Sequence, residues 1–160
     1  MKTMIKRFTG ILLAAAGVLI FSLCEPATGP ESGTGLTFTL ADPESQSVAA
    51  NATGVFRIAI KNNEPSPVSF TCIKNADPFP DASWSASICI GVNCFSPLAD
   101  SVDGGPLAVG ATDTCSVDVQ TGAGGSAQVH FKIYSKEDPA QSYENTFTCA
   151  VVNGMPEASN

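Results

Sequence analysis

Apolar and polar residues alternate one by one in many short segments of this chain beyond residue 35. Successive side chains of a β-strand point to opposite faces of a sheet, so this period of two predicts strands with one buried face. The apolar residues there do not recur at the three- and four-residue spacing of an amphipathic helix. Seven segments carry the alternation: residues 36–40, 56–61, 68–72, 83–90, 115–119, 128–133 and 147–151.

Turn-forming residues separate these segments, as at residues 62–67 and 122–126. Seven short alternating strands predict an all-β fold, a seven-stranded immunoglobulin-like β-sandwich in which two sheets bury their apolar faces against each other. Residues 91–110 form the longest stretch without a strand pattern. We interpret that stretch as a long ordered loop, which is expected to be either pinned or functional.

The first 23 residues have the order of a secretory signal peptide, with Lys2, Lys6 and Arg7 ahead of an apolar run at 11–23. As a helix this run would span ~20 Å, which is less than the ~30 Å hydrocarbon core of a bilayer. We therefore expect a processed signal rather than a permanent membrane span. The expected domains are a signal peptide at residues 1–23, a flexible tether rich in Pro and Gly at 24–35, the β-sandwich at 36–152 and a C-terminal tail at 153–160.

Cys24 ends the apolar run and begins the tether. A cysteine in this place resembles that of a bacterial lipoprotein, in which it is lipidated and becomes the mature N-terminus. Leu23 stands where that family has Gly, Ala or Ser, and Phe21 stands where it usually has Leu. Lipidation, simple secretion and an uncleaved anchor therefore all stay open. A lipidated Cys24 would leave five cysteines and one unpaired thiol, whereas an unmodified Cys24 allows three bridges.

The charge balance narrows the range of partners. Removal of residues 1–23 takes away three of the eight basic residues and none of the fifteen acidic ones, which leaves a formal net charge of −10. Such an acidic domain repels phosphate backbones, so we expect no nucleic-acid partner. The same charge keeps an exported protein soluble.

Four short sequence features follow one another in a recognisable order along the chain. They are a turn that contains asparagine at residues 61–63, a segment at 80–84 that starts with proline and ends with the tryptophan of the fourth predicted strand, a turn at 107–110 before a Thr/Val-rich strand, and a glycine-rich turn at 122–125. This order resembles the Ig-like additional domains of bacterial and archaeal surface proteins, including those appended to alpha-galactosidases. The resemblance covers about residues 36–152. It implies a fold and a surface habitat, not a reaction.

Six cysteines in an exported chain are expected to be mostly bridged, because compartments beyond the inner membrane favour disulfides. Cys89 and Cys94 flank a four-residue segment at the end of the fourth predicted strand. A local turn would bring them together, so we predict this pair. Three further cysteines fall on inward positions of their strands, and the sequence does not choose partners among them: Cys72, Cys115 and Cys149.

Catalytic and cofactor sites have little support in the sequence. It contains neither the Cys-x-x-Cys spacing of redox and zinc sites nor a Gly-x-Ser-x-Gly elbow, and its single histidine, His130, falls on an outward strand position. We therefore expect a protein that is not an enzyme and has no cofactor or metal. Four acidic loop residues suit glycosidic or calcium chemistry in principle, but are more often ordinary turn residues: Asp77, Asp81, Asp100 and Asp103.

The aromatic residues bear on the kind of partner. Trp84 shares the inward phase of its strand, so we expect it in the core, as the strand-C tryptophan of immunoglobulin sandwiches is. Tyr134 and Tyr143 are expected on or near the outward side, where they would form a thin platform for a glycan.

These patterns together predict a non-catalytic exported Ig-like module of the bacterial cell envelope or surface, which acts by protein contact or as a structural unit. The alternatives are a carbohydrate- or calcium-dependent binding module, and a fibre or pilus subunit joined at its edge strands. The expected partner is an unidentified protein or a surface glycan. Contact with a membrane is expected only through the N-terminal signal or a lipid anchor.

Overall fold

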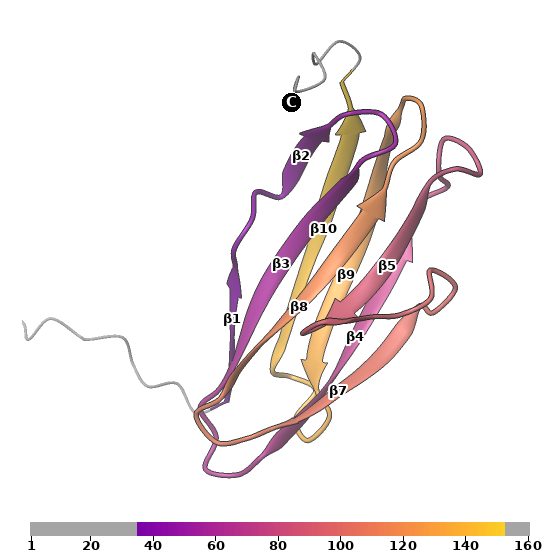
Figure 1. The fold of residues 1–160 in the computed structure, drawn as a ribbon. Helices are drawn as coiled ribbons and strands as arrows, with labels where there is room; N and C mark the ends of the chain where they lie inside the picture. Colours follow the sequence, from indigo (N-terminus) through magenta and orange to yellow (C-terminus); the bar gives the residue numbers. More distant parts are fainter. Residues whose placement is uncertain (1–34, 153–160) are drawn as a thin grey trace, which may run out of the picture. The chain divides into compact units, whose positions relative to one another are not determined.

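The computed structural model describes residues 35–152, and every helix or strand element within that range is a β-strand (Figure 1). The predicted signal peptide, Cys24 with the tether up to residue 34, and the tail at 153–160 lie outside the described residues. The strands are β1 (Leu36–Leu40), β2 (Ser45–Val48), β3 (Thr53–Asn62), β4 (Val68–Ala76), β5 (Ser85–Ile90), β6 (Asn93–Cys94), β7 (Ser101–Leu107), β8 (Thr112–Gln120), β9 (Ser126–Ser135) and β10 (Ser142–Val151).

The strands form two five-stranded sheets that face each other as a sandwich, so the predicted all-β class is confirmed (Figure 1). The strand order is β1-β3-β8-β5-β6 in the first sheet and β2-β10-β9-β4-β7 in the second. β1 pairs antiparallel with β3, whereas β2 pairs parallel with β10, so the N-terminal part of the domain contributes to both sheets. The orders β1-β3-β8-β5 and β10-β9-β4 match the A-B-E-D and G-F-C orders of an immunoglobulin sandwich.

The described residues contain ten strands rather than the predicted seven, and the additional ones are β2, β6 and β7. β2 is almost wholly polar and β6 is two residues long, so neither shows an alternation. β7 contains two glycines and a proline, a composition typical of turns. It is an edge strand, where a proline is tolerated, and a Cβ at Gly104 would collide with the ring of Phe70. The predicted loop at 91–110 therefore holds two strands.

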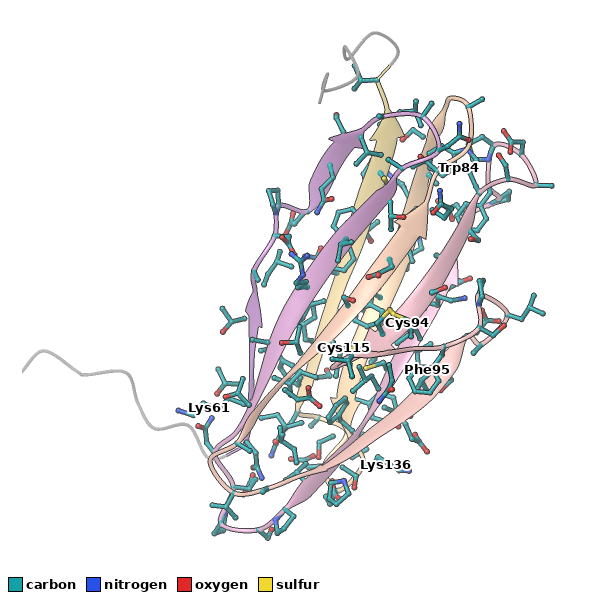
Figure 2. All side chains as sticks on the ribbon, viewed as in Figure 1. Lys61, Trp84, Cys94, Phe95, Cys115 and Lys136 are labelled. Atoms are coloured by element: carbon teal, nitrogen blue, oxygen red, sulfur yellow. A yellow bond between two sulfur atoms is a disulfide. The ribbon has the colours of Figure 1, made fainter. Side chains whose placement is uncertain are left out.

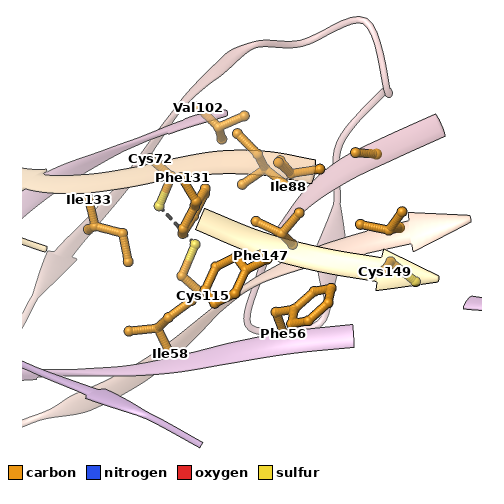
Figure 3. Packing of buried hydrophobic residues seen from close by; sticks show 14 of the residues in the cluster. Phe56, Ile58, Cys72, Ile88, Val102, Cys115, Phe131, Ile133, Phe147 and Cys149 are labelled. Atoms are coloured by element: carbon orange, nitrogen blue, oxygen red, sulfur yellow. Dashed lines mark hydrogen bonds between the residues drawn. The ribbon is translucent and has the colours of Figure 1, made fainter. Parts of the chain in front are cut away.

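One hydrophobic core lies between the two sheets (Figure 3). The pairing of β3 with β8 sets Phe56 opposite Val117 and Ile58 opposite Cys115, so these four side chains enter the core from the first sheet. Phe147 enters from β10 in the second sheet, and its ring stacks on that of Phe56 with centroids 4.7 Å apart. The period-two pattern of the sequence thus decides which residues meet in the core.

A buried asparagine fixes one end of the sandwich. Asn62, the last residue of β3, is fully buried, and its Nδ2 donates to the carbonyl oxygens of Ser66 and Leu107 at 2.9 Å each. Its Oδ1 accepts a hydrogen bond from the backbone N–H of Glu64 at 2.8 Å. All of these groups would lose water on burial, so the amide replaces water as their partner. The asparagine turn at 61–63 is therefore a structural clamp between β3, β4 and β7.

The core position predicted for Trp84 is confirmed, since its side chain is 4% exposed. Trp84 lies just before β5, which occupies the D position, so it differs from the strand-C tryptophan of immunoglobulin sandwiches, whose strand corresponds to β4. The indole Nε1 donates to the carbonyl oxygen of Gly124 at 3.2 Å. Trp84 thereby holds the β8–β9 turn against the end of the sandwich, where Figure 2 places it.

Candidate functional site

The predicted disulfide between Cys89 and Cys94 is present and closes the turn between β5 and β6. Gly91 turns the chain there with a φ of +57°, a conformation that favours glycine, and its N–H donates to the carbonyl oxygen of Thr114 at 2.8 Å. Cys89 is buried and Cys94 is exposed. The disulfide thus ties an exposed turn to the edge of the first sheet.

The chain that follows the disulfide is fastened to both sheets. The N–H of Phe95 donates to the carbonyl oxygen of Ile88 in β5 at 2.9 Å. Lys74 of β4 has a side chain that is 5% exposed, and its Nζ donates to the carbonyl oxygen of Pro97 at 2.8 Å and to Oδ1 of Asp100 at 2.9 Å. We call residues 91–100 the pinned loop, because the first sheet holds its start and the second sheet holds its end.

The pinned loop presents apolar side chains to solvent. Val92 is 96% exposed and Leu98 is 92% exposed, and Phe95 between them is 37% exposed. Figure 2 shows Phe95 close to Cys94 on this edge of the sandwich. Single exposed apolar residues are common on proteins, but several within one fastened segment are typical of a contact surface. The pinned loop is therefore the candidate functional site.

The loop contains one of the four aspartates singled out from the sequence, and each aspartate has its own neighbour. Asp100 Oδ1 accepts from Lys74, as described above, and Asp77 Oδ1 lies 3.6 Å from Nε2 of His130. Asp81 accepts hydrogen bonds from the side-chain hydroxyl and then the backbone N–H of Ser83, and these bonds lower the pKa of Asp81. Among the described residues, no three of these four carboxylates lie within 4.8 Å of one another.

Asp103 makes the most complete set of contacts among the four. Its Oδ2 lies 2.9 Å from Nζ of Lys136, and its Oδ1 accepts a hydrogen bond from Thr71 Oγ1 at 2.7 Å. The hydrogen bond from Lys136 lowers the pKa of Asp103, and the one from Thr71 adds to that effect. The same contact raises the pKa of Lys136. Asp103 lies within β7, not on a loop as the sequence suggested, and it links β7 to β4 and the end of β9.

Two surface hollows of the described domain are lined by residues other than these four aspartates. One hollow of about 270 Å³ is lined by acidic and polar groups that include Glu64, Glu137, Asp138 and Gln141. Another, of about 330 Å³, lies beside His130 on the outer face of β9. His130 is half exposed there, as its outward phase predicts, and its Nδ1 hydrogen-bonds Thr146 Oγ1 at 2.8 Å.

One group of potential metal ligands includes both disulfide sulfurs. The Sγ atoms of Cys89 and Cys94 and a carboxylate oxygen of Asp118 lie within 4.8 Å of one another. Metals bind cysteine as the thiolate, and here the two sulfurs are bonded to each other. With the disulfide formed, this group does not fit a metal.

The three remaining described cysteines are buried on inward positions, as their strand phase predicts. The Sγ atoms of Cys72 and Cys115 lie 2.8 Å apart between the sheets, while Cys149 packs elsewhere on β10. The hydrogen bond with Cys72, followed by burial, raises the pKa of the Cys115 thiol far above its ordinary range. Burial likewise raises the pKa of Cys149.

The two tyrosines are placed differently from each other. Tyr134 is half-buried on the outward phase of β9. Tyr143 lies opposite Ile133, on the inward phase, and its ring centroid is 6.0 Å from that of Phe38. The expectation that Tyr143 lies on the outward side is therefore wrong. β10 already begins at Ser142, so Tyr143 lies four residues before Phe147 in the same strand and faces the same side.

Sequence reasoning did not single out Lys74, Val92 or Leu98. A signal for Lys74 exists, because it continues the inward phase of Val68, Phe70 and Cys72 in β4. A lysine in an apolar phase indicates a buried amine that needs partners. The exposure of Val92 and Leu98 has no comparable signal, since it depends on how the loop is folded.

Comparison with known proteins finds no match among protein-family models and none among curated proteins. Similar solved structures include a family 123 glycoside hydrolase from Clostridium perfringens, with 12% identity over 68% of this chain and 23% of that chain, and a TM-score of 0.47. The chain thus spans about a quarter of the length of that hydrolase.

Two other similar structures match over nearly their whole length. The ASH/PapD-like domain of human CEP192 has 12% identity over 86% of this chain and 97% of that chain, with a TM-score of 0.40. A conjugative transposon lipoprotein from Bacteroides eggerthii has 16% identity over 73% of this chain and 98% of that chain, with a TM-score of 0.47. We draw no functional conclusion from similarities this distant. Residues 35–152 hold no helix with the length and apolarity that a membrane crossing requires.

Proposed function

We propose that this chain is an exported, non-catalytic immunoglobulin-like module of the bacterial cell envelope or surface, and that it binds a protein partner through the pinned loop. The observation that carries the proposal is the near-complete exposure of Val92 and Leu98 on a segment fastened to both sheets. A fastened loop loses little conformational freedom on binding, so its apolar side chains contribute more of their burial energy to affinity.

Export is supported by the cysteines and the N-terminal pattern together. A disulfide such as Cys89–Cys94 persists in oxidising compartments and is rare in a reducing cytosol. The charged-then-apolar order of residues 1–23 is that of a signal peptide. An exported location is the simplest one that accommodates both features.

A protein partner fits the described side chains better than a glycan does. Glycan platforms use exposed aromatic faces, yet Trp84 is 4% exposed and Tyr143 packs against Phe38. The pinned loop presents two aliphatic side chains and one partly covered ring, which suit an apolar pocket. Such contacts resemble the apolar anchors at the centre of protein interfaces.

Site-specific photo-crosslinking in cells that produce the full chain tests this function. A photoreactive amino acid at Leu98 should give one adduct of discrete mass on irradiation, and mass spectrometry should identify the added component as another protein. Val92→Ser in the same chain should lower the adduct yield several-fold, because it removes one anchor of the same contact.

The matched control is a photoreactive residue at Val109, which is 56% exposed in the turn between β7 and β8. It should give little adduct, because Val109 lies outside the pinned loop. Equal yields at Leu98 and Val109, an adduct made only of two copies of this chain, or an adduct with no protein component would each contradict the proposal.

A further inference from the structure

A second pair of sulfur atoms faces across the centre of the core. Cys72 belongs to β4 in the second sheet and Cys115 to β8 in the first, and both side chains are fully buried. Their Sγ atoms lie 2.8 Å apart, as the dashed line in Figure 3 marks. A disulfide bond is ~2.05 Å long. The two sulfurs are therefore within a sub-ångström movement of covalent distance.

The strands around these two residues keep them opposed. β4 is paired with β7 on one side and β9 on the other, and β8 is paired with β3 and β5. Within that frame Cys72 lies opposite Ile133, and Cys115 lies opposite Ile58. Strands bonded on both sides shift little, and close packing around them limits rotamer changes. The approach of the two sulfurs is thus built into both sheets.

Cys149 has a different environment. It is the other free cysteine in the described part of the chain, and it is buried in β10. A Cβ placed on Gly54 would lie 2.7 Å from its Sγ, so this thiol fills the space that a side chain at Gly54 would need. Cys149 therefore behaves as a small apolar residue packed against the backbone of β3.

The timing of any reaction follows from burial. The thiolate is the nucleophile in disulfide exchange, and a fully buried thiol forms little thiolate and meets no reagent. The contact with Cys72 and the burial both oppose ionisation of Cys115. A bond between the two cysteines can therefore form only while the sheets assemble, before the core closes over them.

We propose that Cys72 and Cys115 form a disulfide between the two sheets when the chain folds in the presence of a disulfide donor, and that Cys149 stays a thiol. One thiolate attacks the donor disulfide, which yields a mixed disulfide and releases one donor thiol. The second cysteine then displaces the other donor thiol. The two protein thiols lose two electrons and two protons, and the donor disulfide is reduced to two thiols.

Disulfide mapping of the full wild-type chain tests the pairing without any variant. The chain is unfolded, reduced, refolded with oxidised and reduced glutathione, alkylated under denaturing conditions and cleaved after lysine. Cys72 then lies in residues 62–74, Cys115 in 75–132 and Cys149 in 137–160. The 75–132 peptide also contains Cys89 and Cys94, and a second cleavage before Asp113 separates Cys115 from them.

The expected product joins the peptide of Cys72 to that of Cys115, with Cys149 alkylated. Cys89–Cys94 in the same sample is the internal control, since its local pair should also be oxidised. Alkylated Cys72 and Cys115 beside an oxidised Cys89–Cys94 pair would overturn the proposal. So would a bond from Cys149 to either of them. The refolding is done in vitro, so the outcome is independent of export and of the proposed function.

Melting temperatures give a second readout. Reduction should lower the midpoint by ~20 °C in the wild-type chain and in Cys149→Ala, because a long and a short loop are both opened. In the double variant Cys72→Ala with Cys115→Ala, only the local pair is left to reduce, so the drop should be ~8 °C. An equal drop in all three proteins would contradict a bond between the sheets.

Discussion

The two close pairs of sulfur atoms in the described domain have opposite surroundings. Cys89 and Cys94 are five residues apart at a sheet edge, and Cys94 is exposed. Cys72 and Cys115 are 43 residues apart, fully buried, and belong to opposite sheets. The first pair shapes a turn beside the proposed contact surface. The second pair lies where packing already holds the sheets together.

This difference shows which part of the domain is held by a disulfide and hydrogen bonds and which part is held by apolar packing. Apolar packing fixes the core, so breaking one contact there should affect the whole domain. The pinned loop turns its apolar side chains outward, so Cys89–Cys94, Lys74 and a few backbone hydrogen bonds hold it instead. Breaking one of those should loosen the loop and leave most of the domain unchanged.

The largest expected difference is in thiol reactivity. In the folded, reduced protein, alkylation of Cys72 and Cys115 should be at least ~10³-fold slower than that of Cys94, because the buried thiols react only when the core opens. Time-resolved alkylation followed by peptide mass spectrometry measures all three rates in one sample. Denaturant should abolish the difference. Similar rates without denaturant would mean that the two core sulfurs are accessible.

Truncation of one core side chain should have the next largest effect. Phe147 is fully buried and stacks on Phe56, so Phe147→Ala should lower the free energy of unfolding by ~3–5 kcal/mol. Leu98→Ala in the pinned loop is the matched control and should change it by less than ~0.5 kcal/mol. Urea unfolding of the oxidised proteins measures both. A similar loss in the two variants would erase the contrast between core and loop.

Removal of the local disulfide should have an intermediate effect. Cys89→Ala with Cys94→Ala opens a short loop, so the free energy of unfolding should fall by at most ~2 kcal/mol. Hydrogen exchange of the Phe95 amide, which donates to Ile88, should accelerate more than that of amides in β9. Equal acceleration at both places would mean that the disulfide supports the whole sandwich rather than the loop.

The parts of this fold that follow from neighbouring residues could be predicted from the sequence. Alternation is a local signal, so it located strands such as β3 and β4, and the spacing of Cys89 and Cys94 was enough to pair them. Tyr143 shows the limit even there. Its phase is readable only once β10 is known to start at Ser142.

The parts that depend on distant segments could not be predicted in the same way. The Cys72–Cys115 contact requires knowing that β4 lies across the core from β8. β7 is a strand because it pairs with β4, although its own glycines and proline are typical of turns. The pinned loop likewise depends on Lys74, which reaches residues more than twenty positions further along the chain.

Among the changes that break a fastening of the pinned loop, Lys74→Met is expected to have the smallest global effect. Methionine keeps most of the buried length of the side chain but cannot donate to Pro97 or Asp100. The side chain of Asp100 is 80% exposed and can turn to water, so the free energy of unfolding should change by less than ~1 kcal/mol. The Ala99 amide, which donates to Ser96, should exchange faster because the loop has lost its attachment to the second sheet.

Lys136→Met is the matched control for this loss of a lysine. It removes the ion pair between Lys136 and Asp103. That ion pair also lies on the second sheet, but it holds no residue of the pinned loop. It should leave exchange at Ala99 unchanged, and it should leave the crosslinking yield at Leu98 unchanged, whereas Lys74→Met should lower that yield. If both variants accelerated exchange at Ala99 equally, the order of the pinned loop would depend on the overall charge of the domain and not on the contacts of Lys74. Order that survives Lys74→Met would instead show that the disulfide and the backbone hydrogen bonds suffice.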